Sequence, residues 1–421
     1  MSENRRNWSG SHVYQAEHLF APNHRNELIE IVTQYSKVKA LGTRHSFNSI
    51  ADTQAAIVSM ENFGRILSLD KHNLTVTIEA GVRYGELGQF LESHGFALPN
   101  LASLPHISVV GACATATHGS GVGNGNLATS VCRMEILKSD GSIVTIDRHA
   151  NPDIFEGVVV GLGALGIVLT LTLDIVPSFK VRQDVYQALP FDQALAHFDT
   201  IMSGAYSTSL FTYWTGPFFD QVWRKTQTDD GSPASPTYFS ATLADGKRNP
   251  IRDSSPENCT EQQGIPGPWN DRLPHFRMEF TPSSGEELQT EYFVDRRQAP
   301  EAIQALSAIS AQLAPMVHVT EIRAIAADNL WMSSAFERDS IAIHFTWKKE
   351  WEAVHGLMPQ IEAILAPFKP RPHWGKLFTL PKESIRASYR KLSDFEALVQ
   401  DFDPTRKFSN RFLEQSLLPT D

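Results

Sequence analysis

The sequence predicts an α+β fold with more than one domain. The chain has 421 residues, which is long enough for two domains with separate hydrophobic cores. Some segments show the apolar spacing of helices, and others alternate apolar and polar residues as strands do. The composition changes near Pro177, beyond which aromatic residues, prolines and polar loops become more frequent. This change predicts a domain boundary.

The opening part of the chain predicts a compact succession of strands and helices. Residues 27–36, ELIEIVTQYS, have helical spacing and lead into the short apolar strand VKAL at 38–41. Residues 74–81, LTVTIEAG, alternate as a half-buried strand does. Residues 82–95, VRYGELGQFLESHG, predict an amphipathic helix that ends at Gly95.

Two segments rich in small residues follow this pattern. GTRHSFN, residues 42–48, comes directly after the strand VKAL, and successive N–H groups in a turn that begins at Gly42 can form an anion site. Residues 100–126, NLASLPHISVVGACATATHGSGVGNGN, contain five glycines, so backbone can approach a flat ligand closely. Two such loops suit an extended dinucleotide, and His45 would lie beside it.

The segment GLGALG, residues 161–166, matches the GxGxxG phosphate-binding fingerprint. That fingerprint opens a helix, whereas here an alternating strand follows from Ile167 to Val176. We therefore reject a nicotinamide-binding site. The uncharged stretch 157–173 is predicted to be a buried strand and not a membrane span, because it is interrupted by glycines and then alternates.

The middle of the chain predicts a second set of strands and helices. Residues 227–272 lack periodicity and predict a long irregular excursion. The expected strands are SLFTYW at 209–214, HFRMEF at 275–280, VHVTEIRAIA at 317–326 and SIAIHFTW at 340–347. The expected helices cover 298–314, 350–368 and, in the last part of the chain, 384–402.

Four separated motifs together resemble the vanillyl-alcohol oxidase superfamily of flavoproteins, and within it most of all the alditol (xylitol) oxidases. They are GTRHSFN at 42–48, ATATHGSG at 114–121, GLGALGIV at 161–168 and HWGK at 373–376. The resemblance implies a two-domain fold with a discontinuous FAD-binding domain and a cap domain that carries a large antiparallel sheet. The implied boundaries are 1–178 and 371–421 for the FAD-binding domain and 179–370 for the cap.

The resemblance also implies how FAD is held. The histidine of the GTRHSFN-type motif is bonded to the 8α-methyl carbon of the flavin in this superfamily, which assigns a covalent link to His45. Members with two links carry a cysteine at the opening of the glycine-rich loop, where this chain has Leu104, Pro105 and His106. A single link is therefore expected. The other implied FAD contacts are Gly42, Thr43, Arg44, Ser46, Ser103, Ser108, Gly111, Thr115, Gly166 and Ile167.

Polar side chains are expected on one face of two strands. Alternation aligns Glu321 with Arg323, and His344 with Thr346. Such faces are typical of a half-solvated sheet, but the resemblance makes this face the ceiling over the flavin. Fixed cations lower the free energy needed to deprotonate an alcohol, so Arg323 and Lys376 are the candidate catalytic residues. The expected substrate-binding residues are Ser103, Glu321, Arg323, His344, Thr346 and Lys376.

The activity implied by the resemblance is FAD-dependent oxidation of a terminal hydroxyl of an alditol, such as xylitol or sorbitol, to the aldose. A hydride would pass to flavin N5 and O2 would be reduced to hydrogen peroxide. Aldonolactone oxidases of the superfamily carry a SIDEQ-like segment where this chain has SLPHIS at 103–108, which favours an open-chain polyol. Ala102 lies where family members gate oxygen access, and its small side chain is compatible with an oxidase. The alternatives are a sugar-1,4-lactone oxidase or dehydrogenase on the same scaffold, and a flavin-binding protein without catalysis.

Charge and composition restrict the partners. The chain has 37 basic and 47 acidic side chains and a net charge of −10, which argues against a nucleic-acid or anionic-membrane partner. Three cysteines without metal-ligand spacing predict free thiols and no metal site. The opening MSENRRNWSG lacks the apolar run of a secretory leader, so a cytoplasmic location is expected. The expected partners are a small polyol and O2.

Overall fold

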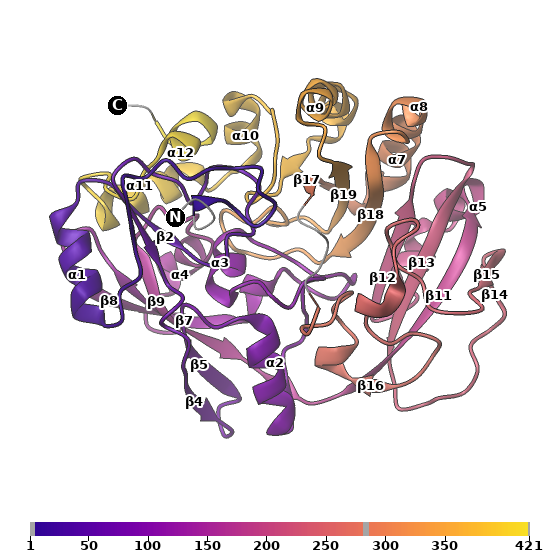
Figure 1. The fold of residues 1–421 in the computed structure, drawn as a ribbon, viewed down its shortest axis with the longest axis horizontal. Coiled ribbons are helices and arrows are strands. Elements are labelled where there is room, and N and C mark those ends of the chain that lie inside the picture. The colour runs from indigo at the N-terminus through magenta and orange to yellow at the C-terminus, as the bar shows by residue number, and fades with distance from the viewer. Residues whose placement is uncertain (1–4, 281–285, 420–421) are drawn as a thin grey trace.

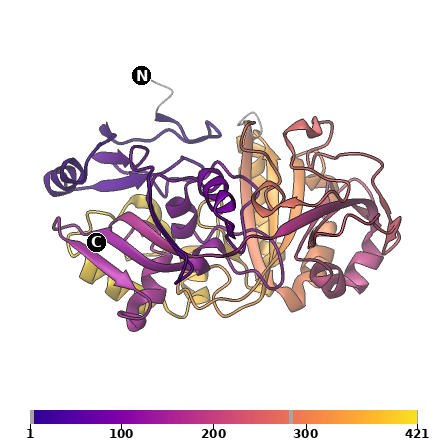
Figure 2. The ribbon, with the colours of Figure 1, turned by 90° about the horizontal axis from the view of Figure 1, so that it is seen from below.

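The computed structural model describes residues 5–280 and 286–419. Residues 1–4 lie outside the described ranges. They belong to the opening stretch MSENRRNWSG, on which the prediction about a secretory leader rests. Figures 1 and 2 show two halves side by side, one holding the N-terminal part of the chain and the other a large sheet. Within the described ranges, every helix is too short or too polar to cross a membrane.

The first half contains two small sheets. β1 (His18–Phe20), β3 (Ala56–Ser59) and β2 (Val38–Leu41) form a parallel sheet that α1 (Arg25–Gln34) connects as the apolar spacing predicts. The second sheet has the order β4 (Ile66–Asp70), β5 (Thr75–Glu79), β9 (Ile167–Asp174), β7 (Val131–Leu137), β8 (Ile143–Asp147). β9 follows GLGALG directly, so the strand context that excluded a nicotinamide fingerprint is confirmed.

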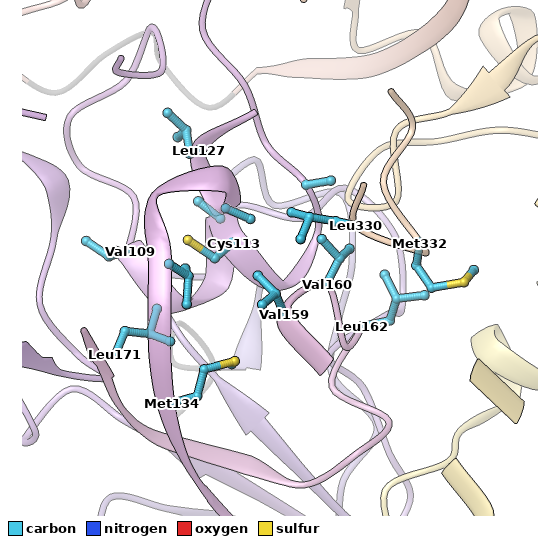
Figure 3. Close-up of a cluster of buried hydrophobic side chains, with 14 of the residues drawn as sticks. Val109, Cys113, Leu127, Met134, Val159, Val160, Leu162, Leu171, Leu330 and Met332 are labelled. Atoms are coloured by element: carbon cyan, nitrogen blue, oxygen red, sulfur yellow. The ribbon is translucent and has the colours of Figure 1, made fainter. Parts of the chain in front are cut away.

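The core of this half collects buried side chains from helices and strands in several parts of the chain. α2 (Tyr84–Ser93) buries Leu87 and Leu91 and is followed by Gly95 in a left-handed conformation, as predicted. Figure 3 shows side chains of α3 (Val109–Ala114), α4 (Pro152–Val159), β7 and β9 converging in this core, with the Cys113 thiol among them.

The second half is organised by a large, mainly antiparallel sheet, which confirms the predicted α+β architecture with a sheet-bearing cap. Its strands, in spatial order, are β14 (Thr237–Tyr238), β15 (Ala241–Leu243), β11 (Lys180–Pro190), β13 (Phe218–Gln227), β12 (Ser207–Thr212), β18 (Val317–Ile325), β19 (Ser340–Lys348), β17 (Glu287–Asp295) and β20 (Arg371–Pro372), with β16 (Gly267–Pro268) beside β11. β10 (Val176–Pro177) pairs with β6 (Phe96–Ala97) where the chain passes between the halves.

Helices cover one face of the large sheet. α7 (Ala299–Ser307) and α9 (Trp351–Leu365) pack their apolar faces against Ile322 of β18 and against Ile343 and Phe345 of β19. The smaller α8 (Ser310–Leu313) follows α7, while α5 (Phe191–Ala196) and α6 (Phe198–Ser203) cover the far strands of the sheet. The opposite, polar face of β17, β18 and β19 is therefore turned toward the first half.

The last part of the chain packs on the first half. α11 (Leu392–Phe402) packs on α4, and α10 (Lys382–Ser388) packs on α12 (Arg411–Ser416). Figure 1 shows α11 and α12 in the half that holds the N-terminal part of the chain. The Asn410 side chain donates to the carbonyl oxygens of Ser49, Ile50 and Asp52 at 2.8 to 3.1 Å. The residue boundaries of the two domains stay a prediction.

Three predicted elements are wrong. The single helix expected over 298–314 is divided into α7 and α8 by a turn at residues 308–309. The other two are the strand HFRMEF in the second half and the single helix over 384–402 in the last part of the chain. HFRMEF is not a strand: Phe276 makes one isolated bridge to Cys259, and the N–H groups of His275 and Phe276 donate to the carbonyl oxygen of Ser103. The single helix expected over 384–402 is broken between α10 and α11. Tyr389 leaves the helical conformation there and is buried against the Trp374 ring, with ring centres 5.3 Å apart.

Candidate active site

A long cavity lies between the first half and the polar face of the large sheet. Its first wall is formed by the turn after β2, the start of α3 and the GLGALG loop. Its second wall is formed by β17, β18, β19 and the HWGK segment after β20, which lies along β17. Asn48 ties the two walls together, because its side-chain amide donates to the carbonyl oxygens of Trp374 (2.8 Å) and Lys376 (2.7 Å). The motifs GTRHSFN and HWGK therefore meet in space.

The first wall has the close backbone approach that a flat cofactor needs. A Cβ atom on Gly42 would lie 2.4 Å from Oγ of Ser108, and one on Gly111 would lie 2.7 Å from the same atom. Gly166 has φ 143°, and a Cβ there would lie 2.5 Å from the carbonyl oxygen of Leu137. A side chain at any of these positions would collide with Ser108 or Leu137, so glycine is what lets these backbone segments approach closely. A wall of closely packed backbone of this kind fits a dinucleotide such as FAD.

His45 lines this wall. Both of its ring nitrogens are buried without a hydrogen-bond partner. The ring stacks on Trp8 with centres 5.3 Å apart, and the preceding residue, Arg44, turns the chain with φ 64°. Burial lowers the pKa of His45 to about 4, so its imidazole is neutral and keeps a lone pair.

Most of the residues predicted to contact FAD line the cavity. Ile167 does not: its side chain lies in the core with Val38 and Leu137, because it begins β9 on the face turned away from the cavity. Ala102, the predicted oxygen gate, is buried and lines the wall. The residues that do line the cavity are Gly42, Thr43, Arg44, His45, Ser46, Ser103, Ser108, Gly111, Thr115 and Gly166.

The second wall contains five of the six predicted substrate-binding residues: Glu321 and Arg323 on β18, His344 and Thr346 on β19, and Lys376 after β20. Strand pairing places Glu321 of β18 opposite His344 of β19, and His344 opposite Glu291 of β17. The next row on the same face contains Thr346 opposite Gln289. All of these side chains line the cavity together with Ser103, Arg323 and Lys376.

Glu291 joins both candidate catalytic cations. Lys376 Nζ donates to its Oε2 atom at 2.6 Å, Arg323 Nη2 donates to Oε1 at 2.8 Å, and Nε2 of His118 lies 3.1 Å from Oε1. Burial opposes ionisation of Glu291, yet the charges of Lys376 and Arg323 and the contact with His118 hold its pKa well below the usual range. The carboxylate is thus an anion that fixes two cations at the cavity.

Several buried polar atoms around Glu321 lack partners. Nε of Arg323 lies 3.6 Å from Glu321 Oε2, Nδ1 of His344 lies 3.9 Å from it, and neither nitrogen has a hydrogen-bond partner. An unpaired buried polar group is energetically costly. A hydroxyl group, with one donor and two acceptor sites, matches the hydrogen-bonding capacity that these three side chains leave unused.

The sequence prediction missed three residues that line the cavity, Glu291, His118 and His275. His275 Nε2 lies 2.8 Å from Glu321 Oε1, although its segment was predicted to be a strand. For Glu291 a signal existed, because Glu287, Gln289 and Glu291 alternate along one face of β17. In the described ranges, no group of three or more His, Cys, Asp or Glu side chains is arranged to hold a metal ion.

A buried lysine under the first wall supplies a pH-dependent test of the structure. Lys39 is 2% exposed, its Nζ donates to the carbonyl oxygens of Gly163 (2.9 Å) and Phe408 (3.0 Å), and burial lowers its pKa to about 7 from 10.5. Between about pH 7 and pH 10.5, Lys39 is mostly protonated in the unfolded chain and mostly neutral in the folded protein. Its contribution to the free energy of unfolding therefore rises with pH, by up to about 1.4 kcal/mol per pH unit. In Lys39→Met this contribution is absent.

The measurement is urea unfolding of the wild type and Lys39→Met at pH 7, 8 and 9. The free energy of unfolding of the wild type minus that of Lys39→Met should increase as the pH rises. Lys71→Met, which changes an exposed lysine, serves as the control and should leave the pH profile unaltered. Parallel profiles for the wild type and Lys39→Met would contradict the burial of a titrating lysine.

Comparisons with known proteins agree with this geometry. Residues 16–147 match the family described as FAD binding domain, and residues 284–416 match the family described as D-arabinono-1,4-lactone oxidase. The chain is 44% identical to alditol oxidase of a Streptomyces species over 98% of each chain. It is 27% identical to L-gulono-1,4-lactone dehydrogenase of Mycobacterium tuberculosis over 98% of this chain and 99% of that protein.

A solved structure supports the fold. The crystal structure of cholesterol oxidase from B. sterolicum superposes with a TM-score of 0.77 at 16% identity and covers 98% of this chain and 96% of that chain. At this identity the likeness concerns the fold alone, which is of the vanillyl-alcohol oxidase type. The full-length similarity to the Streptomyces protein, together with the matched FAD-binding domain, identifies the chain as a member of the alditol oxidase family of FAD-dependent oxidoreductases.

Proposed function

We propose that the protein is an alditol oxidase that converts a terminal hydroxyl of a polyol such as xylitol or sorbitol to the aldose, with O2 as the electron acceptor. The observation that carries the proposal is the second wall of the cavity, where Arg323, Lys376 and Glu321 face a wall shaped for a flavin. The 44% identity to an alditol oxidase supports the same activity. FAD bound there would supply a hydride acceptor and a route for the electrons to O2, which yields hydrogen peroxide.

The protein's own residues prepare the alcohol. Arg323 and Lys376 are both held by Glu291, so their positive ends are fixed before substrate arrives. Because they cannot relax away, they stabilise the negative charge that develops on the hydroxyl oxygen as its proton is released to water. In the balance of the reaction, this proton and the hydride are both consumed when O2 is reduced to hydrogen peroxide. In the proposed complex Ser103, Glu321, His344 and Thr346 bind the remaining hydroxyls of the chain.

The primary test is an anaerobic mixture of the purified protein with xylitol or sorbitol. We expect loss of the flavin absorbance near the visible maximum, and stoichiometric hydrogen peroxide when air is admitted. A flavin that stays oxidised with each of several polyols would support the alternative of a flavin-binding protein without catalysis. Reduction by polyols without peroxide release would indicate an acceptor other than oxygen.

A second candidate is a sugar-1,4-lactone oxidase or dehydrogenase. The match of residues 284–416 to the D-arabinono-1,4-lactone oxidase family favours it. L-Gulono-1,4-lactone and xylitol, tested in the same assay, separate the two. A higher kcat/KM with the lactone would replace the alditol proposal. Ala102 is proposed as the point of oxygen access, and a cytoplasmic location stays a prediction from the sequence.

We also propose that FAD is covalently attached through His45. Both ring nitrogens are unpartnered and the imidazole is neutral, so either nitrogen can form a bond to carbon. The lining cysteine, Cys113, has its thiol in hydrogen-bonding contact with Tyr84 at 3.7 Å, and burial raises its pKa to about 12, which disfavours it as a second attachment site.

His45→Ala is expected to abolish the covalent bond while the cavity still binds FAD reversibly. The measurement is acid denaturation followed by spectra of pellet and supernatant. The wild type should give a yellow pellet, and His45→Ala a yellow supernatant. His72→Ala, which changes an exposed histidine in a turn, is the control and should retain a yellow pellet. A yellow pellet from His45→Ala would move the link to another residue.

A further inference from the structure

A line of buried side chains extends from Glu321 away from the cavity. His275 Nε2 lies 2.8 Å from Glu321 Oε1, and Lys225 Nζ lies 3.1 Å from His275 Nδ1. Lys225 also donates to the carbonyl oxygens of Leu273 and Pro274. Lys225 comes from β13 and is 1% exposed, while His275 comes from the irregular segment before β17 and is 5% exposed.

The positions of the protons follow from these contacts. Glu321 is ionised: burial opposes this, but Arg323 and His275 hold its pKa well below the usual range. A carboxylate has no proton to donate, so the hydrogen in the His275–Glu321 contact lies on Nε2. Burial lowers the pKa of His275 to about 4, so its ring is neutral and Nδ1 carries only a lone pair. Lys225 is therefore the donor to Nδ1.

The second oxygen of Glu321 is left for a ligand. Oε1 is occupied by His275, whereas Oε2 lies 3.6 Å from Arg323 Nε and 3.9 Å from His344 Nδ1, beyond hydrogen-bonding distance. Both of those nitrogens are buried and unpartnered. The carboxylate is thus anchored on one side and open on the side that faces the cavity.

We propose that Lys225 and His275 are positioning residues that fix the ionised Glu321, so that its free oxygen accepts a hydrogen bond from the substrate hydroxyl next to the carbinol that is oxidised. This inference rests on the proposed polyol oxidation. It adds that the preference for a polyol over a simple alcohol depends on His275 and Lys225, which lie behind Glu321. Lys225 does not line the cavity. A hydrogen bond to a charged group contributes about tenfold or more in discrimination.

The test compares two substrates of equal length, 1,2-butanediol and 1-butanol, in anaerobic reduction of the flavin. In Lys225→Met, the His275 ring loses the donor that fixes its tautomer, so the ratio of kcat/KM values, diol over alcohol, should fall about tenfold. The fall should come from the diol alone. His275→Leu should lower the ratio at least as far. His275→Gln, which keeps an N–H group able to reach Glu321, should recover most of it.

Lys369→Met, which changes a lysine in a left-handed turn outside the cavity, is the matched control and should keep the wild-type ratio. Equal losses with both substrates in Lys225→Met and His275→Leu would show a general packing defect and overturn the proposal, as would an unchanged ratio. If His275→Leu does not accumulate as folded, flavin-containing protein, Lys225→Met decides the result. Wild-type protein that no polyol reduces would instead contradict the proposed function itself.

Discussion

Lys376→Met is expected to lower the rate of flavin reduction by xylitol about 10²- to 10³-fold, the usual loss when one fixed group that stabilises a developing oxyanion is removed. Burial lowers the pKa of Lys376, and its ion pair with Glu291 opposes that shift and favours the charged form. The ammonium group is held at the cavity before the reaction, so no other residue replaces it. Stopped-flow reduction at saturating xylitol measures the effect.

The flavin content of Lys376→Met should match that of the wild type. The backbone of residue 376 is held by Asn48 and does not depend on the lysine side chain, and Glu291 retains Arg323 and His118 as partners. Lys71→Met should reduce at the wild-type rate. A wild-type rate in Lys376→Met would remove this lysine from the chemistry and leave Arg323 as the sole candidate cation.

Alternation along single strands predicted the polar face of the cavity from the sequence. Glu321 and Arg323 share one face of β18, and His344 and Thr346 share one face of β19. This succeeds because the side-chain period of a strand is two whatever the strand pairs with. The apolar residues between them pack against α7 and α9.

Long-range pairing explains what the sequence did not reveal. Glu291 reaches the cavity only because β17 lies beside β19 in a register that sets it opposite His344. The sequence of β17 alone indicates only that Glu291 is one of the polar positions of a half-solvated strand. β11 was missed for a related reason: it is buried on both faces and contains the ion pair of Arg182 with Asp184, so it lacks alternation.

Loops that are held by other loops were predicted least well. HFRMEF alternates like a strand, but its backbone N–H groups bind the carbonyl oxygen of Ser103 in the glycine-rich loop. That contact joins positions far apart in the sequence, and it carries His275 to Glu321. The alternation of residues 275–280 is a property of this segment alone, whereas its position in the fold is set by a segment far away in the sequence. A local pattern therefore cannot predict this contact.

Glu291→Gln is expected to destabilise the folded protein by about 3 to 5 kcal/mol, since removing one partner of a buried ion pair leaves an uncompensated charge. Three donors converge on the Glu291 carboxylate, from Lys376, Arg323 and His118. A glutamine offers one acceptor oxygen and turns an N–H2 group toward at least one of these donors. The cations would also lose their fixed positions, so the rate of flavin reduction should fall together with stability.

Urea unfolding and stopped-flow reduction, measured on the same preparation, test this expectation. Glu291→Asp keeps the charge and should retain more of both quantities than Glu291→Gln, because the anion, and not the side-chain length alone, holds the cations. Glu396→Gln removes the partner of Arg386 in a partly exposed ion pair and should change the free energy of unfolding by less than about 1 kcal/mol. If Glu291→Gln were as stable and as active as the wild type, the cations would be positioned by the backbone, and the role assigned to Glu291 would have to be withdrawn.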